Sequence, residues 1–242
     1  MRVALLSDIH ANRTALEAIL EHAAAGGYDA LWVAGDVVGY GPDPNAVVER
    51  LGEEGALCVM GNHDAATLGR LPLEQFNELA AAAVRWTQDH TSEGTRTYLA
   101  GLPEVRQEGE FTIVHGTLRQ PLWEYMSTRE AAEAHLKLQR TPFSVVGHTH
   151  HQLIASLDGK RLLSRTPEED EICPLGEGPS VVNPGGAGQP RDLDPRVGYA
   201  LLDLEALSVQ FLKVPYDIAA TQRRMREAGL PELLAARLAV GR

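Results

Sequence analysis

Gly61-Asn62-His63-Asp64 is the most informative stretch of the sequence, because it follows the apolar run 56–60 directly. Such a short apolar run, bounded by turn formers, is typical of a buried strand. Four other apolar runs end in the same way, in Ser7-Asp8-Ile9-His10, Gly35-Asp36, His115-Gly116 and Gly147-His148-Thr149-His150. We therefore expect five strands that deliver Asp, His or Asn to one edge of a sheet. In open α/β sheets the carboxyl edge is where ligands bind.

The composition of the 242 residues fits one α/β domain. Hydrophobic residues make up 44% and aromatic residues 5%, so the core must be mostly aliphatic. The net charge is −11, with 33 acidic and 22 basic residues. This excess of acid argues against a broad basic face that holds nucleic acid or an anionic membrane. We expect no stable nucleic-acid complex and no membrane association, while the oligomeric state stays open.

Two cysteines, Cys58 and Cys173, are too few for a disulfide scaffold. The first predicted strand begins at Arg2, which leaves no room for a signal peptide. No apolar stretch approaches the length that spans a bilayer. We therefore expect a reduced, cytoplasmic location.

The periodicity of the chain predicts alternating strands and helices. Strands are expected at 2–7, 30–34, 56–60, 111–115, 143–147, 153–156, 161–163, 180–182, 199–202 and 208–214. Helices are expected at 12–25, 45–54, 73–89, 91–100 and 128–138, with a C-terminal helix or helix pair over 217–239. The segment 166–178 is predicted to be an exposed loop.

Together these elements predict a single domain over 1–242, an α/β fold built as a layered αββα sandwich of two mixed β-sheets flanked by helices. The alanine-rich segment at about 65–100 is expected to be a helical insertion in this domain. It either forms a wall or lid of the site or packs simply against the sheet.

The chain has nine histidines, and five of them lie in the clusters at the strand ends. The other four, His22, His90, His135 and His151, are expected to be ordinary core or surface residues. His151 adjoins His150, but neighbouring side chains in an extended segment point to opposite sides. We therefore expect the His151 side chain to point away from the site.

The clustered groups suit divalent metals. Imidazoles mixed with carboxylate and amide oxygens favour ions of intermediate hardness, such as Mn, Fe, Co, Ni or Zn. The clusters contain no cysteine, which excludes a structural zinc site built from cysteine thiolates. Seven or eight ligands exceed the needs of one ion, whereas two ions that share a bridging carboxylate would use them all. Each motif alone is a weak signal, but five in order are hard to explain by chance.

This ordered series of motifs resembles the calcineurin-like metallophosphoesterase superfamily over about residues 3–150. The stretches 36–44, 115–125 and 183–192 are similar to a branch of small bacterial and archaeal phosphodiesterases. The resemblance implies two divalent ions per chain, with manganese first among the candidates. It assigns Asp8, His10 and His150 to one ion, Asn62, His115 and His148 to the other, and Asp36 to both. His63 would act as the catalytic residue beside the substrate, with Asp64 positioned to orient it.

The implied activity is that of a dinuclear metal-dependent phosphodiesterase or phosphatase, a hydrolase. It would cleave phosphodiester or phosphomonoester bonds of small substrates, nucleotides among them, through a metal-activated water. Four residues lie in loops near the site: Tyr40, Trp123, Tyr125 and Arg191. The three aromatic residues either contact the substrate or simply pack, whereas Arg191 is a candidate to hold a second phosphate or a carboxylate. The alternatives from other classes are a non-catalytic binding scaffold and a metal-binding sensor on the same fold.

Overall fold

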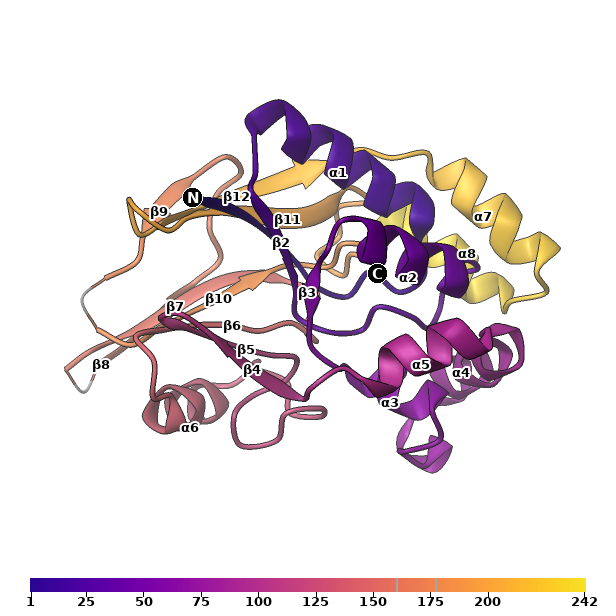
Figure 1. Ribbon diagram of the computed structural model, residues 1–242, viewed down its shortest axis with the longest axis horizontal. Coiled ribbons are helices and arrows are strands. Elements are labelled where there is room, and N and C mark those ends of the chain that lie inside the picture. The colour runs from indigo at the N-terminus through magenta and orange to yellow at the C-terminus, as the bar shows by residue number, and fades with distance from the viewer. Residues whose placement is uncertain (160, 177) are drawn as a thin grey trace.

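The computed structural model describes residues 1–159, 161–176 and 178–242. Figure 1 shows its elements in chain order. The strands are β1 (Arg2–Leu6), β2 (Ala30–Val33), β3 (Leu57–Cys58), β4 (Val105–Glu108), β5 (Phe111–Val114), β6 (Phe143–Val145), β7 (Gln152–Asp158), β8 (Arg161–Arg165), β9 (Ile172–Pro174), β10 (Ser180–Pro184), β11 (Val197–Asp203) and β12 (Ser208–Val214). The helices are α1 (Arg13–Gly26), α2 (Pro44–Glu53), α3 (Asn62–Thr67), α4 (Glu78–His90), α5 (Glu93–Ala100), α6 (Arg129–Leu138), α7 (Ile218–Glu227) and α8 (Glu232–Arg237), with short 3₁₀ turns η1 (Leu73–Gln75) and η2 (Leu238–Val240).

The strands form two six-stranded sheets, ordered β3-β2-β1-β11-β12-β9 and β4-β5-β6-β10-β7-β8. In the first sheet, β1, β2 and β3 are parallel, while β11 runs antiparallel to β1. In the second, β5, β6 and β10 are parallel, while β4 and β7 run antiparallel to their neighbours. Both sheets are therefore mixed, as predicted, and each contributes parallel strands whose carboxyl ends are available for a site.

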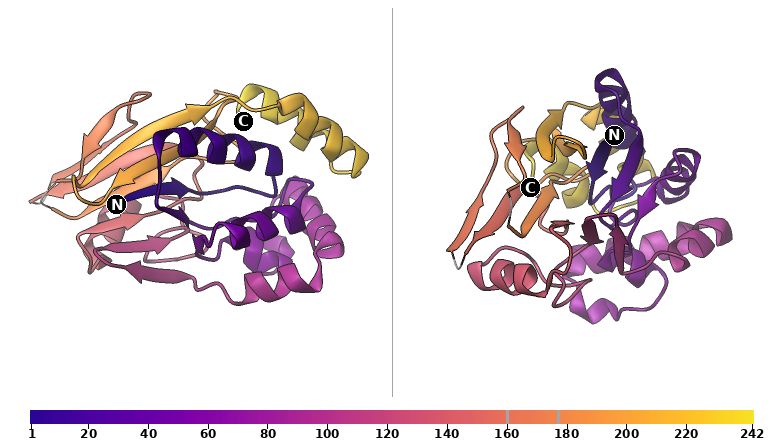
Figure 2. Two further views of the ribbon diagram at one scale, coloured as in Figure 1. Left: turned by 45° about the horizontal axis from the view of Figure 1, so that its top comes forward. Right: turned by 60° about the vertical axis from the view of Figure 1, so that its left-hand side comes forward.

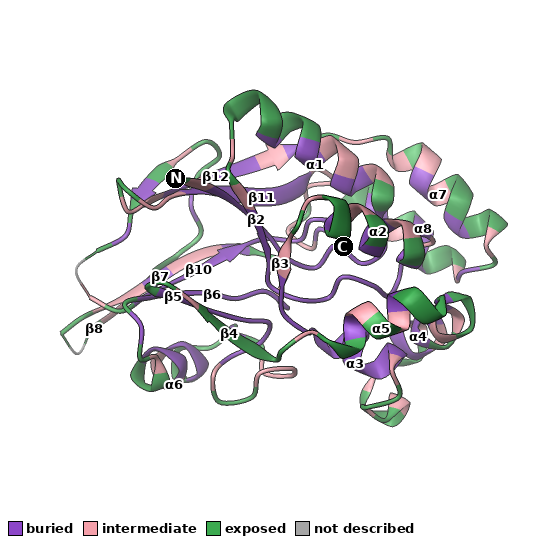
Figure 3. Cartoon of the chain, in the orientation of Figure 1, coloured by how far each residue is buried: buried purple, intermediate pink, exposed green. Residues whose placement is uncertain are grey.

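Alternation along β1 explains how the layers pack, because successive side chains of a strand point to opposite faces. Val3 and Leu5 join a core between the two sheets that also includes Phe111 and Phe211. Ala4 and Leu6 instead join a core beneath the outer helices, including residues of α1 and α2. A further core lies between α6 and the second sheet. The predicted αββα sandwich is confirmed, and Figures 2 and 3 show the buried strands between helices with exposed outer faces.

Most elements lie where the periodicity predicted them. Helix α1 begins after Asn12, whose side chain caps it by accepting from the Ala15 N–H at 3.2 Å. The C-terminal segment divides into α7 and α8, as expected. No helix among the described residues is both long and apolar enough to cross a membrane.

Several expected boundaries are wrong. The helix expected at 73–89 starts at Glu78, because Asn77 caps it and Phe76 is extended. The exposed strand β4 is not predicted from its mainly polar sequence, and β9 lies inside the predicted loop 166–178. Residue 177 of that loop lies outside the described residues. The motif that starts at Gly61 opens helix α3, which the sequence analysis does not predict.

The inserted segment packs against the C-terminal helices. Ala80 and Ala83 of α4 share a hydrophobic cluster with Leu234 of α8. The indole Nε1 of Trp86 donates to the carbonyl of Ala228 at 2.7 Å. The insertion is thereby fixed beside the carboxyl ends of the strands (Figure 1).

Candidate metal centre

The polar residues that follow the five strands come together, but from two sheets rather than one. Three clusters follow β1, β2 and β3 of the first sheet, and two follow β5 and β6 of the second. The prediction of a single sheet edge is therefore wrong, although the structure does bring these residues together. The residues brought together include Asp8, His10, Asp36, His63, His115, His148 and His150.

One group of donors consists of Asp8, His10 and His150, whose ligand atoms lie within 4.8 Å of one another. The Nε2 atom of His150 lies 3.2 Å from Oδ1 of Asp8 and 3.3 Å from Nε2 of His10. Oδ2 of Asp8 accepts a hydrogen bond from the His148 N–H at 3.0 Å. Oδ1 is buried without a hydrogen-bond partner among the described residues. An orphaned carboxylate oxygen beside two imidazole nitrogens fits a divalent cation.

A second group consists of Asp36, His115 and His148. Nε2 of His115 lies 3.4 Å from Oδ2 of Asp36 and 3.0 Å from Nδ1 of His148. It also lies 3.1 Å from Oδ1 of Asn62. This group therefore offers two imidazoles, a carboxylate and an amide oxygen.

Asp36 connects the two groups. Its Oδ2 atom, 3.4 Å from His115, also lies 3.6 Å from Nε2 of His10. One carboxylate therefore faces the donors of both groups. Buried Asp and His clusters that share a carboxylate are typical of a dinuclear metal site.

Backbone carbonyls fix the imidazole tautomers. The Nδ1 atoms of His10, His115 and His150 lie against the carbonyls of Val38, Ala34 and Gln189, at 3.2, 2.8 and 2.5 Å. Because a carbonyl can only accept, each Nδ1 carries hydrogen, which leaves Nε2 as the coordinating atom. In His148 the arrangement is reversed: Nε2 donates to the carbonyl of Trp123 at 3.2 Å, and Nδ1 faces the centre.

The pKa values of the four histidines at the centre also fit metal coordination. Burial lowers the pKa of His10, His148 and His150 well below the ordinary 6.5, so all three are neutral at pH 7. Burial also opposes the charged form of His115, but the Asp36 carboxylate outweighs it and raises the pKa of His115 to about 9. A divalent cation between His115 and Asp36 would take the place of that proton.

The backbone at the site is strained. Five of the predicted ligands have positive φ values: Asp8 (56°), His10 (50°), Asp36 (53°), His148 (67°) and His150 (59°). Such conformations cost about 1–3 kcal/mol each and persist where the surroundings enforce them. Here backbone hydrogen bonds join the loop after β1 to the loop after β2 and hold these conformations. The N–H groups of Asp8 and His10 donate to the carbonyls of Gly35 and Asp36 at 3.0 and 2.9 Å.

Two glycines allow close approach around this centre. A Cβ atom at Gly61 would lie 2.1 Å from Oδ1 of Asp36, and one at Gly39 would lie 2.5 Å from Nδ1 of His63. Gly39 also has a φ of +94°, which favours glycine. The glycine of the Gly-Asn-His-Asp motif is therefore required by its contact with Asp36.

Asp64 does not orient His63 through a hydrogen bond, contrary to the prediction. Its carboxylate accepts from the N–H groups of Val37, Val38 and Gly61, at 3.2, 3.0 and 2.9 Å. The Nδ1 atom of His63 is buried without a partner among the described residues. Asp64 therefore holds the backbone on either side of the centre rather than the imidazole.

A cavity of about 220 Å³ lies over the centre. It is lined by Asp36, Tyr40, Asn62, His63, Gln75, Phe76, Asn77, Ala80, Trp123, Tyr125, His148, His150 and Arg191. All four residues whose role was left open therefore reach it. Phe76 was missed: its ring lies 5.2 Å from that of His63 and 4.9 Å from that of Trp123. The insertion thus forms a wall of the cavity, one of the two roles considered for it.

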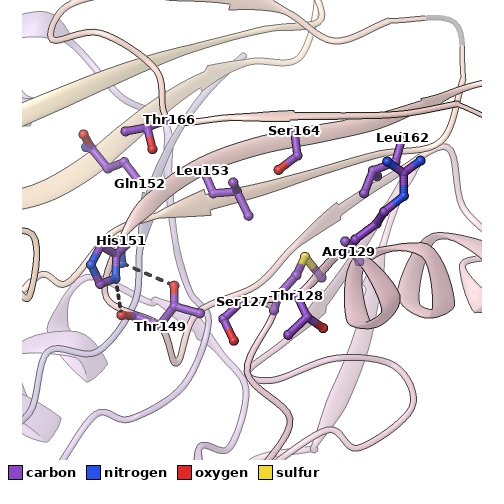
Figure 4. A pocket seen from close by; sticks show the side chains of 12 residues that line it. Ser127, Thr128, Arg129, Thr149, His151, Gln152, Leu153, Leu162, Ser164 and Thr166 are labelled. Carbon is purple, nitrogen blue, oxygen red and sulfur yellow. Dashed lines mark hydrogen bonds between the residues drawn. The ribbon is translucent and has the colours of Figure 1, made fainter.

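The segment after β6 also lines another cavity, of about 480 Å³ (Figure 4). His148 and His150 line the smaller cavity, whereas Thr149 and His151 line the larger one. Nδ1 of His151 donates to the carbonyl of Thr149 at 2.7 Å. The prediction that His151 points away from the site is confirmed.

Comparison with known proteins agrees with this geometry. The model of the calcineurin-like phosphoesterase superfamily domain matches residues 1–207. The uncharacterized protein MJ0912 of Methanocaldococcus jannaschii is 31% identical over 245 residues, which cover 99% of this chain and 98% of that protein. The chain therefore belongs to the calcineurin-like phosphoesterase superfamily.

Two solved structures are similar over the full chain. The crystal structure of a metallophosphoesterase from Sphaerobacter thermophilus has a TM-score of 0.91 and 41% identity, covering 100% of this chain and 99% of that one. Protein PH1004 from Pyrococcus horikoshii OT3 has a TM-score of 0.80 and 23% identity, covering 100% and 98%. The second likeness concerns the fold alone.

Proposed function

We propose that this member of the superfamily is a dinuclear metal-dependent hydrolase that cleaves phosphodiester bonds, or phosphomonoester bonds, of small substrates. The observation that carries the proposal is the position of Asp36, whose Oδ2 faces donors of both groups at 3.6 and 3.4 Å. Two divalent cations held by such a shared carboxylate supply an acidic water and stabilise the charge of a phosphoryl group.

In this proposal each group of donors holds one cation. Asp8, His10 and His150 hold the first, while Asn62, His115 and His148 hold the second, and Asp36 bridges them. The orphaned Oδ1 of Asp8 and the fixed imidazole tautomers support the assignment. The mixture of nitrogen and oxygen donors suits manganese, iron, nickel, cobalt or zinc, and the resemblance to the family puts manganese first among them.

His63 is proposed as the catalytic residue that contacts the phosphoryl group. Its ring lies 4.9 Å from that of His10 and lines the cavity. Burial lowers the pKa of His63 to about 4, so the imidazole is neutral at pH 7. A neutral imidazole can donate one hydrogen bond, and we assign that bond to a phosphoryl or leaving-group oxygen as charge develops there.

The cavity supports a small phosphate ester as the substrate. Its volume of about 220 Å³ is below the range of roughly 300–1,000 Å³ that is usual for drug-sized ligands. Phe76, Trp123 and Tyr125 give it an aromatic wall, and the Tyr125 ring stacks on that of His148 at 3.8 Å. This wall suits a planar organic group, and a nucleotide is one candidate substrate.

A turnover assay with restored metal tests the proposal. The protein is stripped with a chelator and then given Mn²⁺, Ni²⁺, Co²⁺, Fe²⁺ or Mg²⁺ in turn. Each sample is assayed with bis(p-nitrophenyl) phosphate and with p-nitrophenyl phosphate. We expect metal-dependent release of p-nitrophenol, and the ratio of the two rates distinguishes a phosphodiesterase from a phosphatase. Two bound ions without turnover of any phosphate ester would instead favour the scaffold or sensor.

A further inference from the structure

Arg191 lines the cavity over the metal centre and has no carboxylate partner among the described residues. Gln189 connects it to the centre. The Gln189 Oε1 atom accepts from Nη2 of Arg191 at 3.1 Å, and the Gln189 carbonyl accepts from Nδ1 of His150. One residue therefore positions both a predicted metal ligand and this guanidinium.

The acids next to Arg191 in the chain are already paired. Nζ of Lys213 lies 2.5 Å from Asp192 and 3.2 Å from Asp194. Arg196 pairs with Asp194 at 2.7 Å and also with Glu169. These contacts hold the loop in place and leave Arg191 without an ion pair among the described residues.

Arg191 lies close to the reacting centre without joining it. Its guanidinium carbon is 5.9 Å from the centre of the Tyr40 ring, and the Tyr40 and His63 rings are 4.4 Å apart. Nε of Arg191 is buried without a hydrogen-bond partner among the described residues. A buried donor of this kind calls for an acceptor that the rest of the described chain does not provide.

A second arginine adds positive charge beside it. Arg237 of α8 is partly buried, and its Nε donates to the carbonyl of Arg242. Burial lowers the pKa of Arg237, and the nearby charge of Arg191 lowers it further. Two guanidiniums that repel each other favour a nearby anion.

We propose that Arg191 binds a second phosphoryl group of the substrate. The inference rests on the proposed function, because the first phosphoryl group would lie at the metal centre. The preferred substrates are then organic phosphates with two phosphoryl groups, one for hydrolysis and one for recognition. A planar guanidinium offers two parallel donors to phosphate oxygens, which an ammonium group cannot reproduce.

The larger cavity of Figure 4 does not offer such a site, although it too contains an arginine. Nε of Arg129 donates to Glu133 at 2.8 Å, so its charge is already paired. Arg129 therefore provides a matched control, since its replacement removes an arginine from a cavity wall away from the metal centre.

The test compares the binding of two compounds that differ by one phosphoryl group, propyl phosphate and 1,3-propanediol bisphosphate. Their dissociation constants are measured by calorimetry on the Mn²⁺-loaded protein, and also as inhibition of bis(p-nitrophenyl) phosphate turnover. We expect the natural protein to prefer the bisphosphate at least tenfold. Arg191→Gln should reduce the preference to about threefold or less, Arg191→Lys should retain part of it, and Arg129→Gln should leave it unchanged.

Two further outcomes have distinct meanings. An unchanged preference in Arg191→Gln, or no preference in the natural protein, would overturn the subsite and leave the proposed hydrolysis intact. If the natural protein bound neither compound and hydrolysed no ester, the proposed function would fall, and this inference with it. Circular dichroism confirms that each variant is folded, and Arg191→Lys provides the comparison if Arg191→Gln is not.

Discussion

The backbone N–H of His63 donates to Oδ1 of Asp36 at 2.9 Å. One oxygen of the Asp36 carboxylate is thereby bound to the start of helix α3. The other oxygen, Oδ2, is free to face His10 and His115. The bond explains why the third strand-end motif begins a helix, since the free N–H groups of a helix N-terminus stabilise a carboxylate.

Asp36→Asn should lower the metal content from two ions per chain to one or none. The amide still accepts from His63, but it lacks the negative charge that a bridging ligand supplies. Metal content is measured by mass spectrometry after dialysis against Mn²⁺, with Asp89→Asn on the exposed face of α4 as the control. Two ions retained in Asp36→Asn would contradict the bridging assignment.

His63→Ala should keep both ions and reduce kcat by about 10²–10³-fold, the usual effect of removing one hydrogen bond to a charge that develops in the transition state. The matched control is His151→Ala, because His151 directly follows the predicted ligand His150 but faces the larger cavity. We expect the control to retain full turnover. Normal turnover by His63→Ala would exclude contact with the reacting phosphoryl group.

Asp64→Ala should mainly lower the stability of the folded protein. It leaves the N–H groups of Val37, Val38 and Gly61 without their acceptor, and each buried donor left unsatisfied costs about 1–3 kcal/mol. We expect the free energy of unfolding in urea to fall by at least about 3 kcal/mol. If stability were unchanged and only kcat fell, Asp64 would act on His63 after all.

Phe76→Ala should weaken the binding of aromatic substrates. Its ring contacts those of His63 and Trp123, and aromatic pairs contribute about 0.5–1.5 kcal/mol beyond the area they bury. We expect KM for bis(p-nitrophenyl) phosphate to rise about 2–10-fold, with little change in kcat. Leu73→Ala, in the same segment but outside the cavity lining, is the control. A fall in kcat at constant KM would place Phe76 in the chemical step instead.

The candidate ligands could be predicted from the sequence because each follows an apolar run that ends abruptly. The sequence also placed His148 and His150 at the site, although not for the reason of an extended segment, because both residues have positive φ values. The contacts of Asp64 could not be predicted, because they depend on how the loop after β2 lies against helix α3. Phe76 was missed for a related reason: its segment lies far from Trp123 in the chain, and its own sequence carries no signal of their contact.

The same limit applies to the sheets. Strands β5 and β6 carry clear apolar signals, but nothing local shows that they belong to a different sheet from β1. The short, polar strands β4 and β9 are stabilised by pairing with β5 and β12. Pairing of this kind comes from the tertiary structure rather than from the propensity of the segment.

His135 makes the stability of the protein depend on pH at a point away from the metal centre. Its Nδ1 accepts from the Leu118 N–H at 3.1 Å, and its Nε2 lies 2.8 Å from Oγ of Ser144. Burial lowers the pKa of His135 from 6.5 to about 4. The folded protein therefore binds this proton less readily than the unfolded chain, and stability falls as the pH drops from about 6.5 to about 4.

His135→Gln should remove this part of the pH dependence. The full difference of about 2.5 pKa units corresponds to about 3 kcal/mol, because one unit is about 1.36 kcal/mol. The variant should be less stable than the natural protein at pH 7, since it loses two buried hydrogen bonds, and the gap should narrow toward pH 4. Urea unfolding of both proteins at several pH values measures the gap, with His22→Gln as the control at an exposed histidine. A gap that stayed constant between pH 7 and pH 4 would show that His135 does not take up a proton on unfolding.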